Sequence, residues 1–162
     1  MNLIRLQAPD LEKAAPLTAA FRVTLQGFKG IASQPDLPSA REELEEYLAR
    51  DYPIFAAESD GQLAGYTVLR IDDSTIWVEQ LYVREEYRRQ GVASLLFEKA
   101  EELAAGMGGD TLFNFVHPNN HRMIGFLRSK GYTVLNLLEI RKPFQGETLT
   151  TTIRVGDHTF DY

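Results

Sequence analysis

The most constraining feature of the chain is one stretch, residues 75–106. Its first part, TIWVEQLYV, is rich in β-branched and aromatic side chains and predicts a central strand over 75–83. Its last part carries apolar residues at three- to four-residue spacing from Val92 to Leu103, which predicts a helix that ends near Gly106. The turn between them, REEYRRQG, is densely charged and ends in a glycine. The chain must therefore fold around a strand that leads through a charged turn into a helix.

The segment before this unit predicts a strand and two helices. Alternating apolar and polar residues over 3–7 indicate a first strand, and Asp10 is placed to cap a helix that runs to about residue 26. Ser39 followed by Glu42 has the spacing of a capping box, which predicts a second helix over about 39–50.

A hairpin is predicted next. Strand-like runs over 53–59 and 63–71 flank the turn DGQ, a sequence typical of a tight hairpin turn. Together with 75–83, these runs predict three successive antiparallel strands.

The part after the central helix predicts further alternation. A strand is expected over 111–116, a helix capped by Asn119 or Asn120, a strand over 132–140, and a hairpin that turns at Gly156 and Asp157. The element order predicts a mixed α/β (α+β) fold with a largely antiparallel sheet. We expect a single domain over 1–162, in which 147–162 form a C-terminal β extension.

Composition excludes several classes of function. The chain has no cysteine, which excludes disulfides and thiolate chemistry, and its formal charge of −6 disfavours nucleic acid as a partner. No apolar run approaches the ~20 residues of a membrane span, and the amino terminus does not read as a secretory signal, so we expect a cytoplasmic protein without membrane contact. The three histidines lack accompanying acidic ligands, so no metal site is expected.

The charged turn has the chemistry of an anion site. Peptide N–H groups at the start of a helix lack internal acceptors and the helix dipole adds partial positive charge there. Gly91 lets a ligand approach the backbone closely, and Arg88 and Arg89 supply phosphate donors. An ordinary solvated loop with a turn glycine is the alternative. The sequence contains neither G-x-x-x-x-G-K-[ST] nor G-x-G-x-x-G.

The same turn carries a family resemblance. RRQGVA matches the signature [QR]-x-x-G-x-[GA] of the GCN5-related N-acetyltransferase (GNAT) superfamily. IWVEQLYVREEYRRQGVASLLFEKA resembles that family's fourth strand, pyrophosphate loop and third helix, and NHRMIGFLRSKGY resembles its fourth helix and the turn that follows. The resemblance covers about residues 3–142. It implies a sheet of about six to seven strands flanked by about four helices.

The resemblance also implies a site for acetyl-coenzyme A. Backbone amides of 89–94 would hold the pyrophosphate, and the main chain at Leu81 and Val83 would pair with the pantetheine arm beside a bulge in the fourth strand. Asn120 would bond the arm from the other side, with Phe126 packed beside it; the alternatives are a helix cap and a core residue. The residues so implied are Leu81, Tyr82, Val83, Arg88, Arg89, Gln90, Gly91, Val92, Ala93, Ser94, Asn120 and Phe126.

Catalysis requires a group that accepts a proton from the amine. Glu79 resembles a glutamate that polyamine acetyltransferases of the superfamily carry before the bulge, and we predict it as the base, with a solvent-facing strand residue as the alternative. His117, at a strand end, is a second candidate base, and the alternative is a structural histidine, the more common role of a lone His. The tyrosine that often protonates the leaving thiolate is replaced by Leu127, which leaves the acid open among Tyr82, Tyr132, His117, His121 and water.

These features predict an N-acetyltransferase that moves acetyl from acetyl-coenzyme A to a primary amine of a small molecule or protein, by direct attack in a ternary complex. Leu127 supports a rival, a non-catalytic acyl-coenzyme A-binding regulatory module. A second rival is an interaction domain without coenzyme A affinity. Residues 27–39 and 143–146 are expected to set acceptor specificity, and the threonine-rich tail is compatible with a homodimer. The acceptor itself cannot be read from the sequence.

Overall fold

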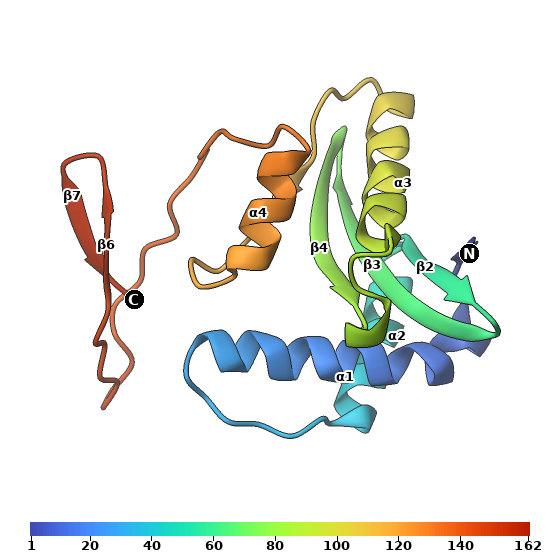
Figure 1. The fold of residues 1–162 in the computed structure, drawn as a ribbon, viewed down its shortest axis with the longest axis horizontal. Coiled ribbons are helices and arrows are strands. Elements are labelled where there is room, and N and C mark those ends of the chain that lie inside the picture. Colours follow the sequence, from blue (N-terminus) through green and yellow to red (C-terminus); the bar gives the residue numbers. More distant parts are fainter. The chain divides into compact units, whose positions relative to one another are not determined.

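The computed structural model describes residues 1–162, the whole of the printed sequence. Contacts between residues group the chain into two compact units, Met1–Ile124 and Gly125–Tyr162. The first unit holds the main sheet and three helices, and the second holds the end of a fourth helix and a separate hairpin (Figure 1). The expectation of one domain with an extension at 147–162 stays a prediction.

Five strands form the sheet of the first unit. They are β1 (Asn2–Arg5), β2 (Ile54–Ser59), β3 (Gln62–Asp72), β4 (Thr75–Val83) and β5 (Phe113–Asn114), and they lie side by side in this order. The first four are antiparallel to their neighbours, whereas β5 runs parallel to β4. The predicted fold class, a mixed α/β protein with a mostly antiparallel sheet, is therefore confirmed.

The turn between β2 and β3 forms as predicted. Asp60 and Gly61 have positive φ angles of 51° and 77°. A two-residue turn with both central residues in the left-handed region has the twist that suits a hairpin, and Asp-Gly is a preferred sequence for it. The DGQ sequence thus fixes where β2 ends and β3 begins.

Helices cover both faces of the sheet. Helices α1 (Leu11–Phe28) and α2 (Leu37–Ala49) pack together and α1 packs on β3 and β4, while α3 (Val92–Gly106) packs on β2, β3 and β4. Residues 63–69 of β3 are all buried, which requires cover on both faces. The core on the α1 and α2 side consists of Leu6, Leu11, Ala14, Leu17, Leu44, Ile54, Ala56, Leu63, Tyr66 and Val68. Full burial of each large apolar side chain contributes about 1.5–3 kcal/mol.

The start of α2 differs from its prediction. The cap is Asp36, whose carboxylate accepts hydrogen bonds from the Ser39 N–H at 3.0 Å and the Ser39 hydroxyl at 2.8 Å. Pro38 lies in the first turn, where its missing N–H costs nothing because that position has no helical acceptor. The predicted capping box at Ser39 and Glu42 is therefore wrong, and the helix begins two residues earlier, at Leu37.

Two strand predictions in the C-terminal third need correction. The strand expected over 111–116 is limited to Phe113–Asn114, and the strand expected over 132–140 does not form. Val134 and Leu137 of that segment are 87% and 69% exposed. High β-propensity cannot make a strand without a partner, and β6 (Thr152–Val155) pairs with β7 (His158–Asp161) instead.

The remaining C-terminal elements follow the sequence signals. Helix α4 (His121–Ser129) begins in the first unit and ends in the second, and the amide oxygen of Asn120 caps it by accepting from the Met123 N–H at 3.1 Å. Gly131, with a φ of 89°, follows its end. The hairpin of β6 and β7 turns at Gly156, as predicted.

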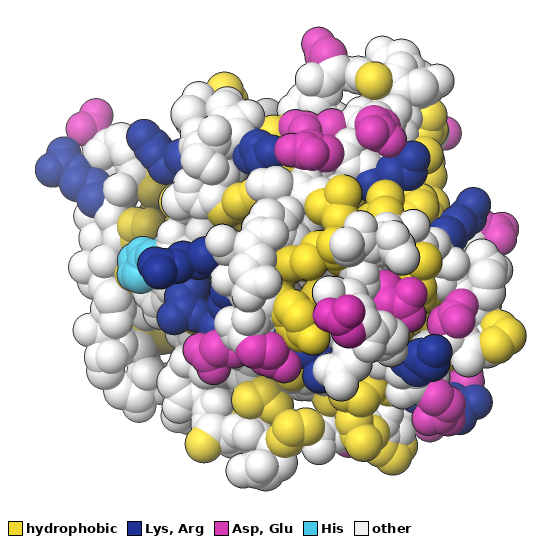
Figure 2. Space-filling view, turned by 45° about the vertical axis from the view of Figure 1, so that its right-hand side comes forward, with side chains coloured by type: hydrophobic (Ala, Val, Ile, Leu, Met, Phe, Trp, Pro, Cys, Tyr) yellow, Lys and Arg dark blue, Asp and Glu magenta, His cyan; other side chains and the backbone are white.

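Charge and apolar character are spread over the surface. Figure 2 shows acidic and basic side chains interspersed, with apolar side chains between them. No helix combines the length and apolar character needed to cross a bilayer. No three histidine, aspartate or glutamate side chains lie together in a way that would hold a metal ion.

Candidate functional site

The two edges of β4 differ in pairing. Along one edge β4 pairs with β3 over its whole length, but along the other it pairs with β5 only at Trp77 and Val78. From Glu79 to the end of β4, that second edge therefore has no neighbouring strand. Where the strands part, Asn114 has a buried amide oxygen without any hydrogen-bond partner. An extended ligand with amide groups can pair with such an edge as an added strand.

A β-bulge lies where β4 and β5 separate. In the register of β3 with β4, Val68 faces Gln80 and Leu69 faces Val78, so Glu79 is the extra residue. A bulge bends its strand and increases the local twist. The bulge in this strand, which the family resemblance implies, is therefore present, and Glu79 itself forms it.

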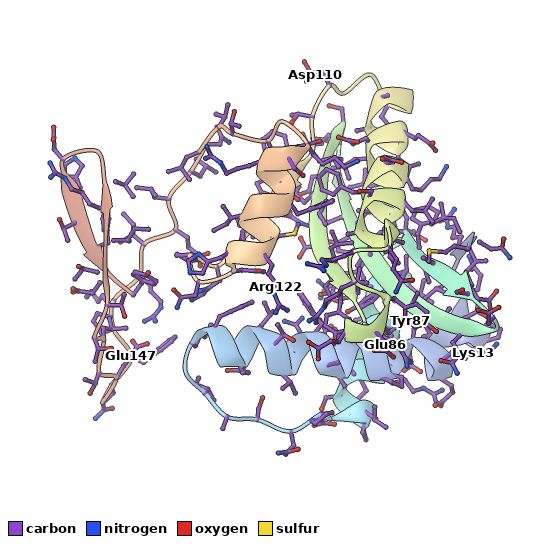
Figure 3. All side chains as sticks on the ribbon, in the orientation of Figure 1. Lys13, Glu86, Tyr87, Asp110, Arg122 and Glu147 are labelled. Carbon is purple, nitrogen blue, oxygen red and sulfur yellow. The ribbon has the colours of Figure 1, made fainter.

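The charged turn after β4 presents unpaired donors. Glu86 and Tyr87, labelled in Figure 3, lie in a short 3₁₀ turn, after which Arg89 and Gly91 take positive φ angles of 60° and 84°. The first helical hydrogen bond of α3 runs from Leu95 N–H to the Gly91 carbonyl. No peptide N–H of residues 89–94 donates to an acceptor within the protein. A helix start with free N–H groups has the geometry that suits an anion, and the predicted contact of residues 89–94 with a pyrophosphate stays a prediction.

The two arginines of this turn have different roles. The Arg88 side chain turns back, donating to the Val83 carbonyl at 3.2 Å and pairing with Glu85 at 3.2 Å. Gln90 likewise donates to the Glu86 carbonyl at 2.7 Å. Arg89 makes no such contact within the chain. Arg88 and Gln90 therefore stabilise the turn, whereas the Arg89 guanidinium has no partner within the chain; the predicted contacts of all three with a cofactor stay predictions.

Gly65 of β3 sets how closely the strand approaches this turn. A Cβ at Gly65 would lie 2.6 Å from the Tyr82 carbonyl oxygen and 3.1 Å from the Val92 side chain. The backbone contact cannot relax without a shift of β3 against β4. Only glycine fits here.

Gly65→Ala is therefore expected to lower the free energy of unfolding by about 1–3 kcal/mol, the usual cost of overpacking. Urea denaturation measures it. Gly27→Ala is the control, because a Cβ at Gly27 meets nothing within 4 Å and alanine is the better helix former. Equal stabilities of Gly65→Ala and the unmodified protein would contradict the close approach.

A hydrogen-bonded network lies on the α1 and α2 side of the bulge. Glu43 of α2 accepts from Arg22, with Arg22 Nε 2.8 Å from Glu43 Oε2, and its other oxygen accepts from the Tyr47 hydroxyl at 2.9 Å and the Gln80 amide at 2.5 Å. Gln80 in turn accepts from the Tyr66 hydroxyl at 2.5 Å. Burial raises the pKa of Tyr66, so it stays a neutral donor. Glu43 is thus held between two helices and the sheet.

Glu79 has a separate set of neighbours. Its Oε1 accepts from Arg70 Nε at 2.6 Å, and Arg70 also pairs with Asp72. The Arg70 guanidinium lies over the Trp77 ring, 5.0 Å from its centroid. The Glu79 side chain is 24% exposed, so it is partly buried, and its role as the base stays a prediction.

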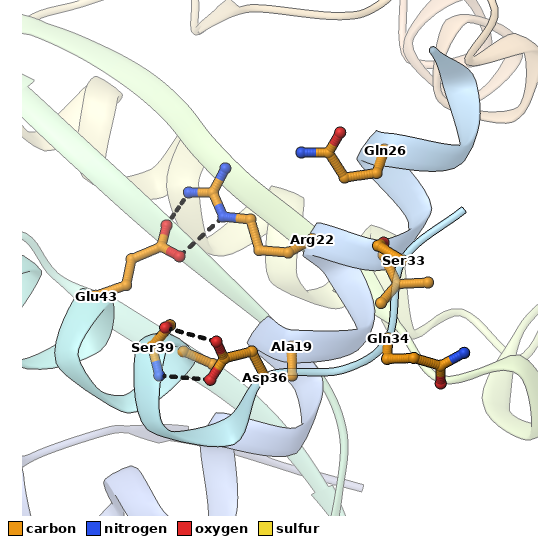
Figure 4. Close-up of a pocket in the computed structure, with 10 residues that line it drawn as sticks. Ala19, Arg22, Gln26, Ser33, Gln34, Asp36, Ser39 and Glu43 are labelled. Atoms are coloured by element: carbon orange, nitrogen blue, oxygen red, sulfur yellow. Dashed lines mark hydrogen bonds and ion pairs between the residues drawn. The ribbon is translucent and has the colours of Figure 1, made fainter. Parts of the chain in front are cut away.

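A cavity of about 320 Å³ opens between α1, α2 and the segment that joins them (Figure 4). The Arg22–Glu43 ion pair and the Asp36 cap of α2 form part of its wall. Its lining is Ala19, Arg22, Val23, Gln26, Ser33, Gln34, Asp36, Ser39, Ala40 and Glu43. The cavity thus includes part of residues 27–39, the segment predicted to set acceptor specificity.

His117 is built into the loop after β5. Its ring stacks on Phe28 with 6.0 Å between centroids, and its Nδ1 accepts from the Asn119 N–H at 3.1 Å. Asn119 also donates to the Phe28 carbonyl at 2.9 Å, which ties this loop to the end of α1. Burial lowers the pKa of His117, and the nearby charge of Lys29 adds to the effect. These contacts fit the structural role; a catalytic role stays a prediction.

The other predicted cofactor residues lie at α4. Asn120 caps this helix through its amide oxygen, which is the structural alternative considered for it. Phe126 and Leu127 lie on the part of α4 that belongs to the second unit. The predicted contacts of Asn120 and Phe126 with a pantetheine arm stay predictions.

The arrangement of an open strand edge, a bulge and a charged turn with unpaired N–H groups agrees with a comparison to known families. The model of the acetyltransferase (GNAT) family matches residues 20–132, a range that includes all three features. The chain belongs to this family. The family and the acyltransferase class predicted from RRQGVA and its surroundings are thereby confirmed.

Relatives of this GNAT protein support the assignment. An uncharacterized N-acetyltransferase of Mycobacterium tuberculosis strain H37Rv is 30% identical over 130 residues, which cover 79% of this chain and 75% of that protein. Another, from the pepI 3′ region of Lactobacillus delbrueckii subsp. lactis, is 30% identical over 82 residues, 46% of this chain and about half, 47%, of that protein.

Solved structures share the fold. A probable acetyltransferase superposes with a TM-score of 0.72 at 24% identity, covering 91% of this chain and 100% of the other. The PaiA N-acetyltransferase of Thermoplasma acidophilum in complex with coenzyme A gives a TM-score of 0.66 at 22% identity, covering 80% of this chain and 89% of the other. At these identities the likeness shows the fold alone.

Sequence reasoning missed the residues that surround the bulge. Arg70, Glu43 and Gln80 are not in any motif, and their contacts join β3, α2 and β4. One signal was available: in the alternating pattern of β4, Gln80 takes the next buried position after Ile76 and Val78, and a buried polar side chain needs hydrogen-bond partners.

Proposed function

We propose that this protein is an N-acetyltransferase that transfers acetyl from acetyl-coenzyme A to a primary amine by direct attack in a ternary complex. The main support is the unpaired edge of β4, which leads directly into the unpaired N–H groups of residues 89–94. An extended amide-containing arm fits the first feature and a pyrophosphate fits the second. Family membership supports the same cofactor.

The residues present fit acetyl-coenzyme A. Main-chain groups of Leu81 and Val83 would pair with the pantetheine arm, and the buried oxygen of Asn114 would accept from one of its amides. The N–H groups of 89–94 and the Arg89 side chain would hold the pyrophosphate. In the open space beside Gly91, a Cβ would meet nothing within 4 Å.

Chemistry would take place beside the bulge. The neutral amine attacks the carbonyl carbon of the thioester, a C–N bond forms, the C–S bond breaks and the sulfur leaves as a thiolate. A primary amine has a pKa near 10.4, so exposing its lone pair at neutral pH costs about 4–5 kcal/mol. A group that accepts the amine proton is therefore needed.

Of the two carboxylates near the bulge, Glu79 suits this task better. Glu43 and Glu79 are similarly exposed, 20% and 24%, so burial does not separate them. Their hydrogen bonds separate them, because both oxygens of Glu43 already accept hydrogen bonds from the protein, whereas Oε2 of Glu79 accepts no hydrogen bond from it. We propose Glu79 as the base, directly or through one water. Leu127 has no proton to give, so the thiolate would take its proton from water or from one of the side chains Tyr82, Tyr132, His117 and His121.

The rival function is a non-catalytic acyl-coenzyme A-binding module, which the leucine at position 127 favours. Both functions predict cofactor binding and only one predicts transfer. A homodimer and a cytoplasmic location also stay predictions.

Calorimetric titration with acetyl-coenzyme A, followed by a transfer assay over a panel of primary amines, tests the proposal. We expect micromolar binding that weakens with dephospho-coenzyme A, and acetylated product with at least one amine. Binding without transfer to any amine would support the binding module. A folded sample that does not bind acetyl-coenzyme A would refute both functions.

A further inference from the structure

Arg70 is held on three sides. It lies on β3 directly across from Trp77 of β4, and its guanidinium rests over the Trp77 ring at 5.0 Å from the centroid. Its Nε donates to Glu79 and another of its nitrogens pairs with Asp72. Trp77 is itself fixed by Phe113 and Phe115, whose ring centroids lie 5.0 and 4.7 Å away.

The contact with Glu79 uses one oxygen only. Arg70 Nε lies 2.6 Å from Glu79 Oε1, a short charge-assisted hydrogen bond, and Oε2 accepts nothing from the protein. An Arg–carboxylate pair is frequently bidentate, with two parallel bonds. Here Asp72 takes a second donor of the guanidinium. The pair therefore orients the Glu79 carboxylate and still leaves one oxygen able to accept a proton.

A second ion pair near the bulge, Arg22 with Glu43, shows the contrast. Arg22 contacts both oxygens of Glu43, and Tyr47 and Gln80 each donate a further hydrogen bond to that carboxylate. Such a group can stabilise the packing of α2 on the sheet but has no capacity left for a substrate. Only the pair of Arg70 and Glu79 combines a fixed orientation with an open acceptor.

We infer that Arg70 is a positioning residue for the reaction, acting through Glu79. The Glu79 side chain has three rotatable bonds, and its hydrogen bond to Arg70 restricts their rotation before the amine binds. Oε2 therefore stays in one position relative to the substrate. The proton moves from the amine nitrogen to Glu79 Oε2, directly or through one water, while Oε1 stays bonded to Arg70. This inference rests on the proposed acetyl transfer.

A double-mutant cycle tests it, with the rate of acetyl transfer as the readout. Arg70→Gln is expected to lower kcat by about 10- to 100-fold, the size of effect expected from misplacing a reacting group. The KM for acetyl-coenzyme A should change less than about twofold, because the side-chain contacts of Arg70 are with Glu79, Asp72 and Trp77 and not with residues 89–94. In a Glu79→Gln background, Arg70→Gln should lower the rate no further.

Three further variants separate positioning from stability. Arg70→Lys supplies a cation without the planar fork, so it should recover part of the lost rate. Arg50→Gln is the matched control: it removes an arginine from the exposed pair with Glu46 and should leave kcat unchanged. If Arg70→Gln does not fold, Asp72→Asn provides a second test, because it removes one ion pair of Arg70 and leaves the arginine in place. Asp72→Asn should also lower kcat, and it should lower the rate no further in a Glu79→Gln background.

The outcomes also distinguish a failure of this inference from a failure of the proposed function on which it rests. Transfer by the unmodified protein, with independent, multiplicative losses for Arg70→Gln and Glu79→Gln, would overturn the positioning role alone. Loss of acetyl-coenzyme A affinity in Arg70→Gln would overturn it as well. Absence of transfer by the unmodified protein would refute the proposed enzyme function, and the inference with it.

Discussion

Gly91→Glu is expected to abolish measurable binding of acetyl-coenzyme A, with affinity at least about 100-fold weaker. Two effects act together. Gly91 has a φ of 84°, where any side chain adds strain of about 1–3 kcal/mol. A carboxylate there would also face the pyrophosphate that the neighbouring N–H groups are proposed to hold, and such like-charge contacts cost several kcal/mol. Calorimetric titration measures the loss.

The control for this variant lies at the other end of the same helix. Gly108 follows α3 with a φ of 81°, and a Cβ there meets nothing within 4 Å, as at Gly91. Gly108→Glu therefore adds the same charge with similar backbone strain and should bind acetyl-coenzyme A normally. Gly91→Ala separates strain from charge and should bind more tightly than Gly91→Glu. Unchanged affinity in Gly91→Glu would mean that the turn is only a charged loop.

The strand, turn and helix around Gly91 were predictable because local chemistry fixes each of them. β-branched residues define β4, apolar spacing defines α3, and the glycine at the junction is required by its left-handed backbone. The Asp60–Gly61 hairpin was predictable for the same reason. These features depend on residues that are near one another in the sequence.

Features that depend on distant contacts were not predictable. The segment 132–140 has strand propensity, yet no strand partner is present and its apolar side chains are exposed. The hydrogen bond between Glu43 and Gln80 joins residues 37 positions apart, and no local pattern indicates it. In each case the residue types allow an interaction, but only the three-dimensional fold determines which partner, if any, lies within reach.

The site shows the same division. The sequence predicted Glu79 as a base from a family resemblance, but it could not show that Glu79 is the bulged residue or that Arg70 lies beside it. The register of β3 with β4 decides both facts. The bulge places Glu79 on the side where Arg70, two residues after Val68, also lies. The position of the proposed base therefore comes from strand register rather than from a motif.

Glu79→Gln is expected to lower kcat by about 10²- to 10⁴-fold at neutral pH, the usual contribution of a positioned base. The amide keeps the size of the side chain but has no carboxylate oxygen to take the amine proton. The loss should shrink as the pH rises toward the pKa of the amine, near 10.4, because more of the acceptor is then already neutral. Affinity for acetyl-coenzyme A should be unchanged. Steady-state rates over a pH series measure this dependence.

Glu43→Gln is the matched comparison, because Glu43 is the other carboxylate near the bulge and accepts a hydrogen bond from Gln80, the residue after Glu79. Its carboxylate is fully hydrogen-bonded by Arg22, Tyr47 and Gln80, so the amide should lower stability and affect turnover much less than Glu79→Gln does. The reverse pattern, a large loss of rate in Glu43→Gln and none in Glu79→Gln, would assign the proton to Glu43. Equal rates in all three proteins would mean that neither carboxylate is the base and that water takes the amine proton without them.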